Sequence, residues 1–329
     1  MENLTDSLSK YNLLFKGKVR NIYDYDNERL LIYTSDRISA FDYVFKDEVP
    51  GKGILLTKMA KFWFKKTSHI IQNHISNEQL DIPQNIQENC MLVTKTKVLP
   101  IEAIVRGHLA GSAWSTYEST GKINNTEMLR PYKKYDKFSE PIFTPSTKAE
   151  IGGKDENISI KQMQNIIGTD LTNTVQKISI ELFEFAYNFA KERGVIIADT
   201  KFEFGYVTDK QGNEKLIYMD EVGTPDSSRI WDGSNYRDGK VVENSKEGFR
   251  QLLLAHFPEP DILLDKNRMD ERNALAKNNE LPESVMMQVS DTYVSLAEKI
   301  TGQPLIISDN PKAEIIAILN EDYGLVDQG

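Results

Sequence analysis

The spacing of apolar residues predicts a β-rich N-terminal region that contains one helix. Short apolar runs of strand length occupy residues 13–15, 19–25, 29–36 and 90–99. Among residues 54–66, Leu56, Met59, Ala60 and Trp63 recur at helical spacing, and lysines lie on the opposite side. These lysines indicate a solvated helix face rather than a binding patch.

The remainder of the chain predicts a long helix, a β-hairpin and then further helices. Residues 174–193 form a buried helical pattern that ends at Gly194, where a left-handed capping residue is expected. Two strand patterns, 195–207 and 214–222, flank the turn sequence DKQGN and predict a hairpin. After about residue 243 the pattern becomes helical.

Two C-terminal helices have recognisable starting points. One follows Leu281-Pro282 and ends at Gly302, and the other follows Asn310-Pro311, an N-cap residue before a proline. The apolar positions of the first are Val285, Val289, Tyr293, Leu296 and Ile300, and those of the second are Ile315, Ile316 and Leu319. Neither helix concentrates reactive groups, so we expect both to pack against the body of the protein.

Composition and charge narrow the class of protein. The 329 residues are 40% hydrophobic and 27% charged, which excludes wholesale disorder, and the length predicts two domains or one large unit with an appendage. The net charge of -9 argues against a general nucleic-acid-coating role. No apolar run approaches the roughly 20 residues that span a bilayer, and the N-terminus lacks the pattern of a signal peptide. We therefore expect a cytoplasmic protein with no membrane partner and no nucleic-acid partner.

The cysteine and the histidines offer little chemistry. Cys90 is the single cysteine and lies in the apolar run CMLV, which favours a buried, inert thiol. The four histidines have neither metal spacing nor a paired nucleophile, so we expect surface or packing roles for His69, His74, His108 and His256. His108, inside RGHLAGS, is the one nearest to other candidate residues.

The hairpin carries the most informative pattern of charges. Alternation places Phe202 and Phe204 on one face and Asp199, Lys201 and Glu203 on the other. A turn centred between residues 211 and 212 would set Glu203 opposite Asp220, where two bare carboxylates repel each other. A divalent cation such as Mg²⁺ removes that repulsion, and an ordinary charged hairpin face in solvent is the alternative. An odd-length turn would break this register.

Five further strings are candidates for anion binding. The string FKGKVRNIY could form a basic hairpin tip over polyphosphate, and a basic turn in solvent is the alternative. In RGHLAGSAW, Gly107 and Gly111 would let backbone N–H groups approach an anion beside Arg106 and Ser112. Arg229 in TPDSSRIWD is a further bidentate anion binder. In SDRISAFD, Asp36 could simply cap a turn, and the turn-rich segment 141–159 has Lys148 at its middle.

Taken in order, the strings KGKVRNIYD, SDRISAFD, PIEAIVRGHLAGSAW, FTPSTKAE, ADTKFEFG and DEVGTPDSSR resemble the signatures of the SAICAR synthetases of purine biosynthesis. The resemblance runs from about residue 13 to about residue 255, and the extra helical C-terminus is similar to the longer version of the enzyme. It implies an α+β or α/β fold, with an ATP-grasp-like, two-lobed architecture. We expect a β-rich ATP-covering lobe over residues 1–97, an α/β catalytic lobe over 98–243, and a helical segment over 244–329 packed on the body.

The resemblance also implies a reaction and its cofactors. The family joins L-aspartate to the phosphoribosyl aminoimidazole carboxylate with ATP, giving SAICAR, ADP and phosphate. ATP and Mg²⁺ are therefore expected, together with small-molecule substrates, and a monomer is expected rather than an oligomer. Because ATP activates the carboxylate as an acyl phosphate or an equivalent species, no protein nucleophile is needed.

Residue roles are implied position by position. ATP would be bound by Lys16, Gly17, Lys18, Val19, Arg20, Val98 and Lys148. The carboxylate ribonucleotide would be bound by Asp36, Ser39, Arg106, Gly111, Ser112, Asp199, Lys201, Asp226 and Arg229. The catalytic residues would be Lys148, Asp199 and Lys201, and Mg²⁺ would be held by Glu203 and Asp220.

Two positions depart from the family pattern, and two other functions stay open. Lys154 replaces a usual histidine, and Gly223 replaces a usual leucine, which we expect to loosen a turn while leaving the acids intact. A small-molecule or protein kinase would share a glycine loop over ATP, but H-R-D, D-F-G and V-A-I-K are absent from the sequence. A non-catalytic nucleotide-binding regulator would not need both Glu203 and Asp220.

Overall fold

The N-terminal lobe is an antiparallel sheet covered by one helix. The computed structural model describes residues 8–124, 126–128, 131–148, 155–209, 211–265, 267–278 and 281–305. Strands β1 (Asn12–Lys16), β2 (Arg20–Asp24), β3 (Arg29–Thr34) and β6 (Cys90–Thr94) pair in the order β1-β2-β3-β6. A hairpin of β4 (Arg37–Ala40) and β5 (Tyr43–Glu48) follows β3, and the short helix α3 (Gln84–Gln87) precedes β6.

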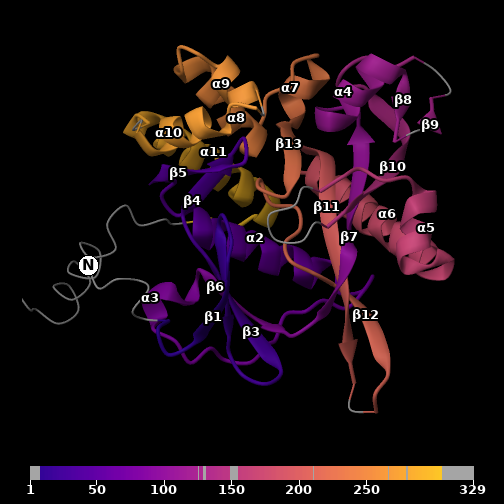
Figure 1. Cartoon of the computed structure of the whole chain (residues 1–329), viewed down its shortest axis with the longest axis vertical. Helices are drawn as coiled ribbons and strands as arrows, with labels where there is room; N and C mark the ends of the chain where they lie inside the picture. The colour runs from indigo at the N-terminus through magenta and orange to yellow at the C-terminus, as the bar shows by residue number, and fades with distance from the viewer. Residues whose placement is uncertain are drawn as a thin grey trace, which may run out of the picture.

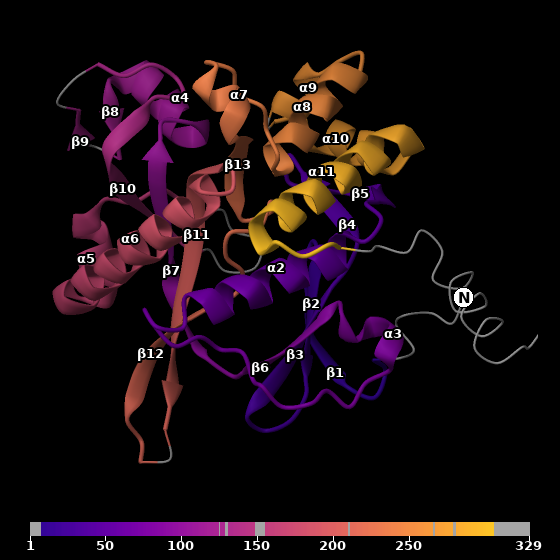
Figure 2. The same cartoon turned by 180° about the vertical axis from the view of Figure 1, so that it is seen from behind.

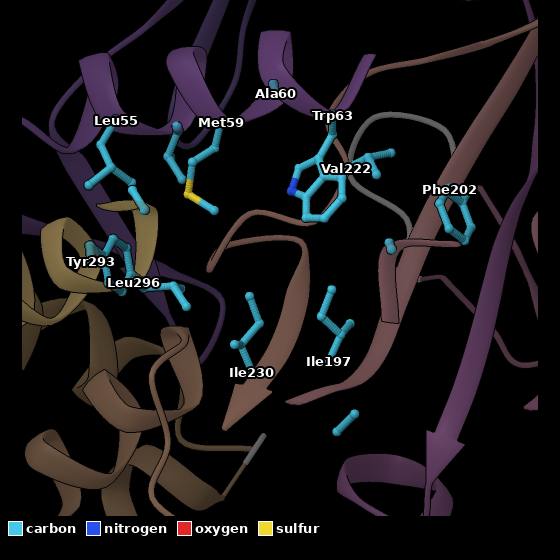
Figure 3. Packing of buried hydrophobic residues seen from close by; sticks show 14 of the residues in the cluster. Leu55, Met59, Ala60, Trp63, Ile197, Phe202, Val222, Ile230, Tyr293 and Leu296 are labelled. Atoms are coloured by element: carbon cyan, nitrogen blue, oxygen red, sulfur yellow. The ribbon is translucent and has the colours of Figure 1, made fainter. Parts of the chain in front are cut away.

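Helix α2 (Lys52–Lys66) joins this lobe to the rest of the molecule. Leu56, Met59, Ala60 and Trp63 are all buried, as their spacing predicted, and Lys65 and Lys66 are exposed. Figure 3 shows Met59 and Trp63 directed away from the helix, towards Val222 and Ile230 of the second lobe. One continuous hydrophobic cluster therefore passes from α2 into the second lobe.

The second lobe is built on a five-stranded sheet. Its strands are β7 (Lys97–His108), β10 (Lys137–Thr147), β11 (Val195–Thr208), β12 (Glu214–Met219) and β13 (Ser228–Asp232). The order is β10-β7-β11-β12, and β13 pairs with the first half of β11. Helices α6 (Thr169–Lys191) and α5 (Ile160–Ile167) cover one face of the sheet, beside α4 (Gly111–Thr120), β8 (Lys122–Ile123) and β9 (Thr126–Glu127), as Figure 1 shows.

Helix α6 forms because its apolar positions recur with helical spacing, and it ends near Gly194, whose φ of 74° confirms the predicted left-handed cap. The side of α6 that faces the sheet includes Leu182, Phe183 and Ala186, all buried. Phe183 packs so close to β7 that a β-carbon on Gly107 would lie 2.9 Å from its ring. Gly107 therefore allows the close approach of α6 to the sheet, and the predicted approach of its backbone N–H to an anion stays a prediction.

The β11–β12 hairpin has a different register from the predicted one. Glu203 pairs with Met219 and Thr208 pairs with Glu214, so the connecting loop spans 209–213 and has an odd length. Asp220 follows the last paired residue and adopts a φ of 69°, which takes it out of the strand. The prediction that Glu203 lies directly opposite Asp220 is wrong. Phe202 and Phe204 pack in the main hydrophobic cluster, whereas Asp199, Lys201 and Glu203 form ion pairs, which confirms the predicted alternation of faces.

Helices complete the C-terminal part of the described chain: α7 (Gly233–Arg237), α8 (Lys246–His256), α9 (Asp261–Leu264), α10 (Met269–Asn278) and α11 (Glu283–Thr301). Helix α11 lies along α2, as Figure 2 shows from behind, and it ends at Gly302 with a φ of 71°. Tyr293, Leu296 and Ile300 of its predicted apolar face are buried. The helix predicted after Pro311 lies outside the described residues.

The architecture confirms the predicted mixed fold: a β-rich N-terminal lobe, an α/β lobe and C-terminal helices (Figure 1). The proposed division at residues 97/98 and 243/244 stays a prediction, because one hydrophobic cluster runs through all three parts. Within the described ranges, no helix is long and apolar enough to cross a membrane.

Candidate active site

Neighbouring strands of the large sheet bring charged side chains onto one face. Strand β7 pairs with β11 so that Arg106 lies opposite Asp199 and Glu102 lies opposite Glu203. Alternation keeps Lys201 of β11 on the same face, between these two pairs. The opposite face carries apolar side chains such as Phe202, so one face packs in the core and the other carries the charged site.

At one end of this face, lysines and carboxylates form an acid–lysine cluster of Glu102, Lys148, Lys201, Glu203 and Asp220. Lys201 Nζ lies 2.5 Å from Glu102 Oε1 and 2.8 Å from Glu203 Oε1. Lys148, which follows β10, pairs with the other oxygen of Glu203. Burial lowers the pKa of Lys148. Burial acts in the same direction on Lys201, but the charges of Asp220 and Glu102 outweigh it and raise the pKa of Lys201.

Arg20 connects this cluster to the N-terminal lobe. Its Nη1 donates to Asp220 Oδ1 at 2.5 Å, and its Nη2 pairs with Glu221. Burial opposes ionisation of Asp220, but Arg20 and Lys201 prevail and hold the pKa of that carboxyl below its usual range. For Glu221, burial is the larger effect and raises the pKa, in spite of Arg20. The cluster therefore lies between the two lobes.

The predicted metal ligands, Glu203 and Asp220, come close to the same ammonium groups even though they are not cross-strand partners. Lys201 touches Glu203, and the Asp220 charge acts on both Lys201 and Lys148. Hard carboxylate oxygens of this kind suit Mg²⁺, with water and phosphate filling the other positions. Among the residues described, no group of three or more His, Cys, Asp or Glu side chains is arranged to hold a metal ion.

At the other end of the face, Arg106 and Arg229 form a guanidinium pair around Asp199. Asp199 Oδ2 lies 2.5 Å from Arg229 Nη1 and 3.4 Å from Arg106 Nη1. Arg106 also donates to Thr144 Oγ1 at 2.9 Å and to Ser112 Oγ at 3.4 Å. Two guanidinium groups held on one face of the sheet suit a phosphate or carboxylate ligand.

Gly111 lies directly against the guanidinium pair, and its role in substrate binding stays a prediction. It starts α4 with a φ of 56°, and a β-carbon there would lie 2.6 Å from Arg229 Nη1. Any larger residue would displace the guanidinium group. Glu243 and Glu247 approach the other nitrogens of Arg229, with Nε–Oε1 and Nη2–Oε2 separations of 3.8 and 3.6 Å.

The predicted ATP-binding string forms the turn between β1 and β2. Gly17 N–H donates to Arg20 O at 2.8 Å, and Lys18 Nζ reaches Asp42 Oδ1 at 3.4 Å on the partly exposed surface. Lys16 ends β1, and the side chain of Val19 packs on the main core. Val98, predicted to meet adenine, is 42% exposed near the start of β7, opposite Gly205.

Asp36 and Ser39 belong to the N-terminal lobe and make different contacts. Asp36 accepts backbone N–H groups of Gly51 and Gly53 at 3.1 and 2.7 Å, so its carboxylate caps the start of α2. This geometry matches the turn-capping alternative. Ser39 is buried, and its hydroxyl accepts from Lys246 Nζ at 3.0 Å.

Asp226 is the centre of a second charged group, the Asp226 cluster, which comprises Lys52, Asp226, Lys246 and Tyr293. Lys52 Nζ and Lys246 Nζ lie 2.8 and 3.7 Å from Asp226 Oδ2, and Tyr293 Oη donates to Oδ1 at 3.2 Å. Burial opposes ionisation, but the two lysines lower the pKa of Asp226. Helices α2, α8 and α11 therefore meet at one carboxylate.

Gly223 does not loosen its turn. Its φ is 62°, its carbonyl accepts from Trp63 Nε1 at 3.2 Å, and a β-carbon would lie 2.4 Å from that nitrogen. The glycine fits the indole of a buried tryptophan, which corrects the expectation of a looser turn. The other departure from the family pattern, Lys154, lies outside the described residues.

His74, His108 and Cys90 are buried packing residues, and His69 and His256 are exposed, which agrees with the expected packing or surface roles. His108 is fully buried against the rings of Trp231 and Tyr236, and burial lowers its pKa to about 4. His74 is also buried, with its pKa lowered to about 4. Burial raises the pKa of Cys90 to about 12, so its thiol is inert.

Four charged residues of the site were missed in the sequence: Lys52, Glu102, Glu221 and Lys246. A signal existed for Glu102, because strand alternation places it on the same face as Arg106. Glu221 directly follows a predicted metal ligand. Lys52 and Lys246 gave no signal, because each reaches Asp226 only through the packing of a helix onto the sheet.

Comparisons with known proteins agree with this geometry. The family model of SAICAR synthetase matches residues 13–259. A phosphoribosylaminoimidazole-succinocarboxamide synthase of Shewanella pealeana is 46% identical over 94% of this chain and 93% of its own. The solved SAICAR synthase of Saccharomyces cerevisiae, complexed with SAICAR, is 36% identical and covers 90% of this chain and 96% of its own, with a TM-score of 0.74.

A further SAICAR synthetase, solved in complex with ADP, shares the fold at 22% identity. Its TM-score is 0.61, and the match covers 89% of this chain and 99% of the other. The match to the family model and the high identity over nearly the whole length of both chains lead to one conclusion. This chain belongs to the SAICAR synthetase family.

Proposed function

We propose that this protein is the ATP-dependent ligase that joins L-aspartate to the carboxylate of the phosphoribosyl aminoimidazole carboxylate. The products are SAICAR, ADP and phosphate. The observation that carries the proposal is the placement of a guanidinium pair and an acid–lysine cluster at the two ends of one sheet face. One end suits a ribose phosphate, and the other suits the transferring phosphoryl group of ATP.

The guanidinium pair holds the ribonucleotide in this proposal. Arg106, Arg229 and Ser112 bind the ribose phosphate, and Asp199 keeps both guanidinium groups in place. The imidazole then extends along β11 towards Lys201. Fixing a substrate at its phosphate removes much of the entropy cost of aligning its carboxylate for reaction.

The acid–lysine cluster serves the phosphoryl transfer. A carboxylate oxygen of the ribonucleotide attacks the terminal phosphorus of ATP, the bond to ADP breaks, and an acyl phosphate forms. Lys148 and Lys201 lie where they neutralise charge that spreads over the transferred oxygens. Glu203 and Asp220 would hold Mg²⁺, which neutralises further charge on the phosphates when bound.

The second step forms the carbon–nitrogen bond. The neutral amine of L-aspartate attacks the activated carbonyl carbon, the carbon–oxygen bond to phosphate breaks, and the amine nitrogen loses a proton. Arg20 ties the N-terminal lobe to Asp220 and Glu221, so the turn with Lys16, Gly17, Lys18 and Val19 lies beside the same centre. We propose that this turn and Val98 bind ATP.

The direct test is ADP release from Mg·ATP, with the imidazole carboxylate and L-aspartate added singly and together. We expect turnover only with both, and a product with the absorbance of SAICAR. Turnover with the carboxylate alone would indicate that the acyl phosphate leaks to water. ATP binding without turnover in any mixture would contradict the ligase and favour a non-catalytic binder.

The metal assignment has its own test. The Glu203→Gln variant removes one carboxylate charge with little change in shape, so use of Mg·ATP should weaken far more than binding of the imidazole carboxylate. Glu214→Gln is a matched control, because Glu214 lies on the same hairpin and is exposed. An equal loss of both ligands in Glu203→Gln would contradict the assignment.

A further inference from the structure

The Asp226 cluster holds one more positive charge than its central carboxylate neutralises. The side chain of Lys52 is completely buried, and its Nζ pairs with Asp226 Oδ2 at 2.8 Å. Tyr293 Oη donates a hydrogen bond to Asp226 Oδ1 at 3.2 Å. Both oxygens of Asp226 are therefore engaged before Lys246 is considered. Burying a second ammonium group beside a carboxylate that is already paired is costly unless another anion completes the site.

Lys246 is the lysine whose charge Asp226 does not neutralise through a hydrogen bond. Its Nζ is 3.7 Å from Asp226 Oδ2, beyond hydrogen-bond distance, and it donates to the neutral Ser39 Oγ at 3.0 Å. Within the described part of the chain, no other carboxylate forms an ion pair with it. The side chain is 17% exposed, so a ligand from solvent can reach it, whereas Lys52 is sealed from solvent.

Lys246 lies within electrostatic range of Glu221, the partner of Arg20. Asp226 acts electrostatically on Arg20, and Glu221, which pairs with Arg20, acts on Lys246. Lys246 begins α8, and Ser39 lies on β4 of the N-terminal lobe. An anion held between these two residues would lie where the C-terminal helices meet the N-terminal lobe, next to the acid–lysine cluster.

The proposed reaction has four sets of anionic groups, and three of them already have cationic partners. The ribose phosphate faces the guanidinium pair, the imidazole carboxylate extends towards Lys201, and the phosphates of ATP face Lys148, Lys201 and Arg20. The carboxylates of the amino acid remain. A single ammonium group with one hydroxyl can hold one carboxylate through a charge-assisted hydrogen bond and a neutral one.

We propose that Lys246 and Ser39 bind a carboxylate of the amino-acid substrate, L-aspartate, and so set the preference for an acidic amino acid. This inference rests on the proposed ligase function and adds a substrate site to it. Lys52 and Tyr293 act as positioning residues, because they fix Asp226 and leave Lys246 to the ligand. The ammonium group of Lys246 gains a charge partner when the substrate binds.

Steady-state kinetics of SAICAR formation test this site. In the Lys246→Met variant, the KM for L-aspartate should rise about 10- to 100-fold, as for loss of one charged hydrogen bond. The KM values for ATP and for the ribonucleotide should stay within about threefold. Lys246→Arg should recover part of the loss, and Ser39→Ala should raise the KM for L-aspartate by about fivefold. The exposed Lys240→Met is the matched control and should behave as the wild type.

A second measurement separates the site from a general loss of structure. Succinate carries the two carboxylates without the amine, so it should inhibit the wild type competitively with L-aspartate. Its inhibition constant should rise in Lys246→Met by the same factor as the KM. An unchanged KM and inhibition constant in a variant that turns over would overturn the inference while leaving the ligase intact. No SAICAR formation by the wild type would overturn the proposed function itself.

Discussion

Trp63 and Gly223 allow a sharp test of how the lobes are packed. Gly223 has a φ of 62°, and a β-carbon there would lie 2.4, 2.7 and 2.8 Å from three atoms of the Trp63 indole. Trp63 is fully buried and also packs edge-on against Phe189 at a ring separation of 5.5 Å. The indole therefore has little room to move away from a new side chain.

The cost of Gly223→Ala can be worked from these contacts. The left-handed backbone costs roughly 1–2 kcal/mol for a residue with a β-carbon, and overpacking of a buried site costs about 1–3 kcal/mol more. We expect a loss of about 2–5 kcal/mol in the free energy of unfolding. Trp63→Leu alone should cost about 3 kcal/mol, because it leaves a cavity. In the double variant, the methyl group added at position 223 occupies part of the space that the indole of Trp63 leaves, so part of both losses should be recovered.

Urea unfolding followed by circular dichroism measures all four proteins of this cycle. The double variant should be more stable than the sum of the single losses predicts, by about 1–3 kcal/mol. Gly239→Ala is a control for backbone conformation alone, because Gly239 has a φ of 77° with no atom within 4 Å of the added carbon. Losses that add within about 0.5 kcal/mol would refute the steric coupling.

Three further predictions concern titration, positioning and reactivity. Burial raises the pKa of Glu243 from 4.5 to about 7. The folded protein therefore holds this proton more tightly than the unfolded chain does. The free energy of unfolding should fall by roughly 3 kcal/mol as the pH rises from 4.5 to 7. Urea unfolding at several pH values should show that slope removed in Glu243→Gln, and an unchanged slope would contradict the assignment. Tyr293→Phe removes one donor to Asp226, so kcat/KM for L-aspartate should fall about 5- to 30-fold in initial-rate assays; a wild-type value would show that this hydrogen bond does not position Asp226. Cys90 is buried with its pKa raised to about 12, so a thiol reagent at pH 8 should modify the protein only after unfolding, and rapid modification of the native protein would disprove this burial.

The sequence predicted local structure well where one periodic pattern decided it. The buried side of α2 and the left-handed ends at Gly194 and Gly302 follow from spacing and from backbone freedom. The register of the β11–β12 hairpin could not be predicted in the same way, because one more or one fewer loop residue shifts every cross-strand pair by one position. The loop 209–213 has an odd length, and Glu203 faces Met219.

The charged site was predictable along strands but not between distant elements. Arg106 and Asp199 lie on strands whose alternation can be read in the sequence. Lys52 could not be found, because residues 52 and 226 meet only after α2 packs on the second lobe. Asp36 shows that a local pattern can suffice: its polar string predicted a turn cap, and both of its oxygens accept backbone N–H groups at the start of α2.

Strand β11 sets the distance between the two charged groups of the site. From Asp199 to Glu203 its pairing with β7 is regular, and the sheet pairings of β11 are irregular directly before and directly after this segment. Four residues at about 3.3 Å each set roughly 13 Å between the two ends of the site. The spacing between the guanidinium pair and the acid–lysine cluster is thus set by one continuous strand, without any hinge. A single inserted residue would turn half of the charged groups into the core, so this segment can change length only in steps of two.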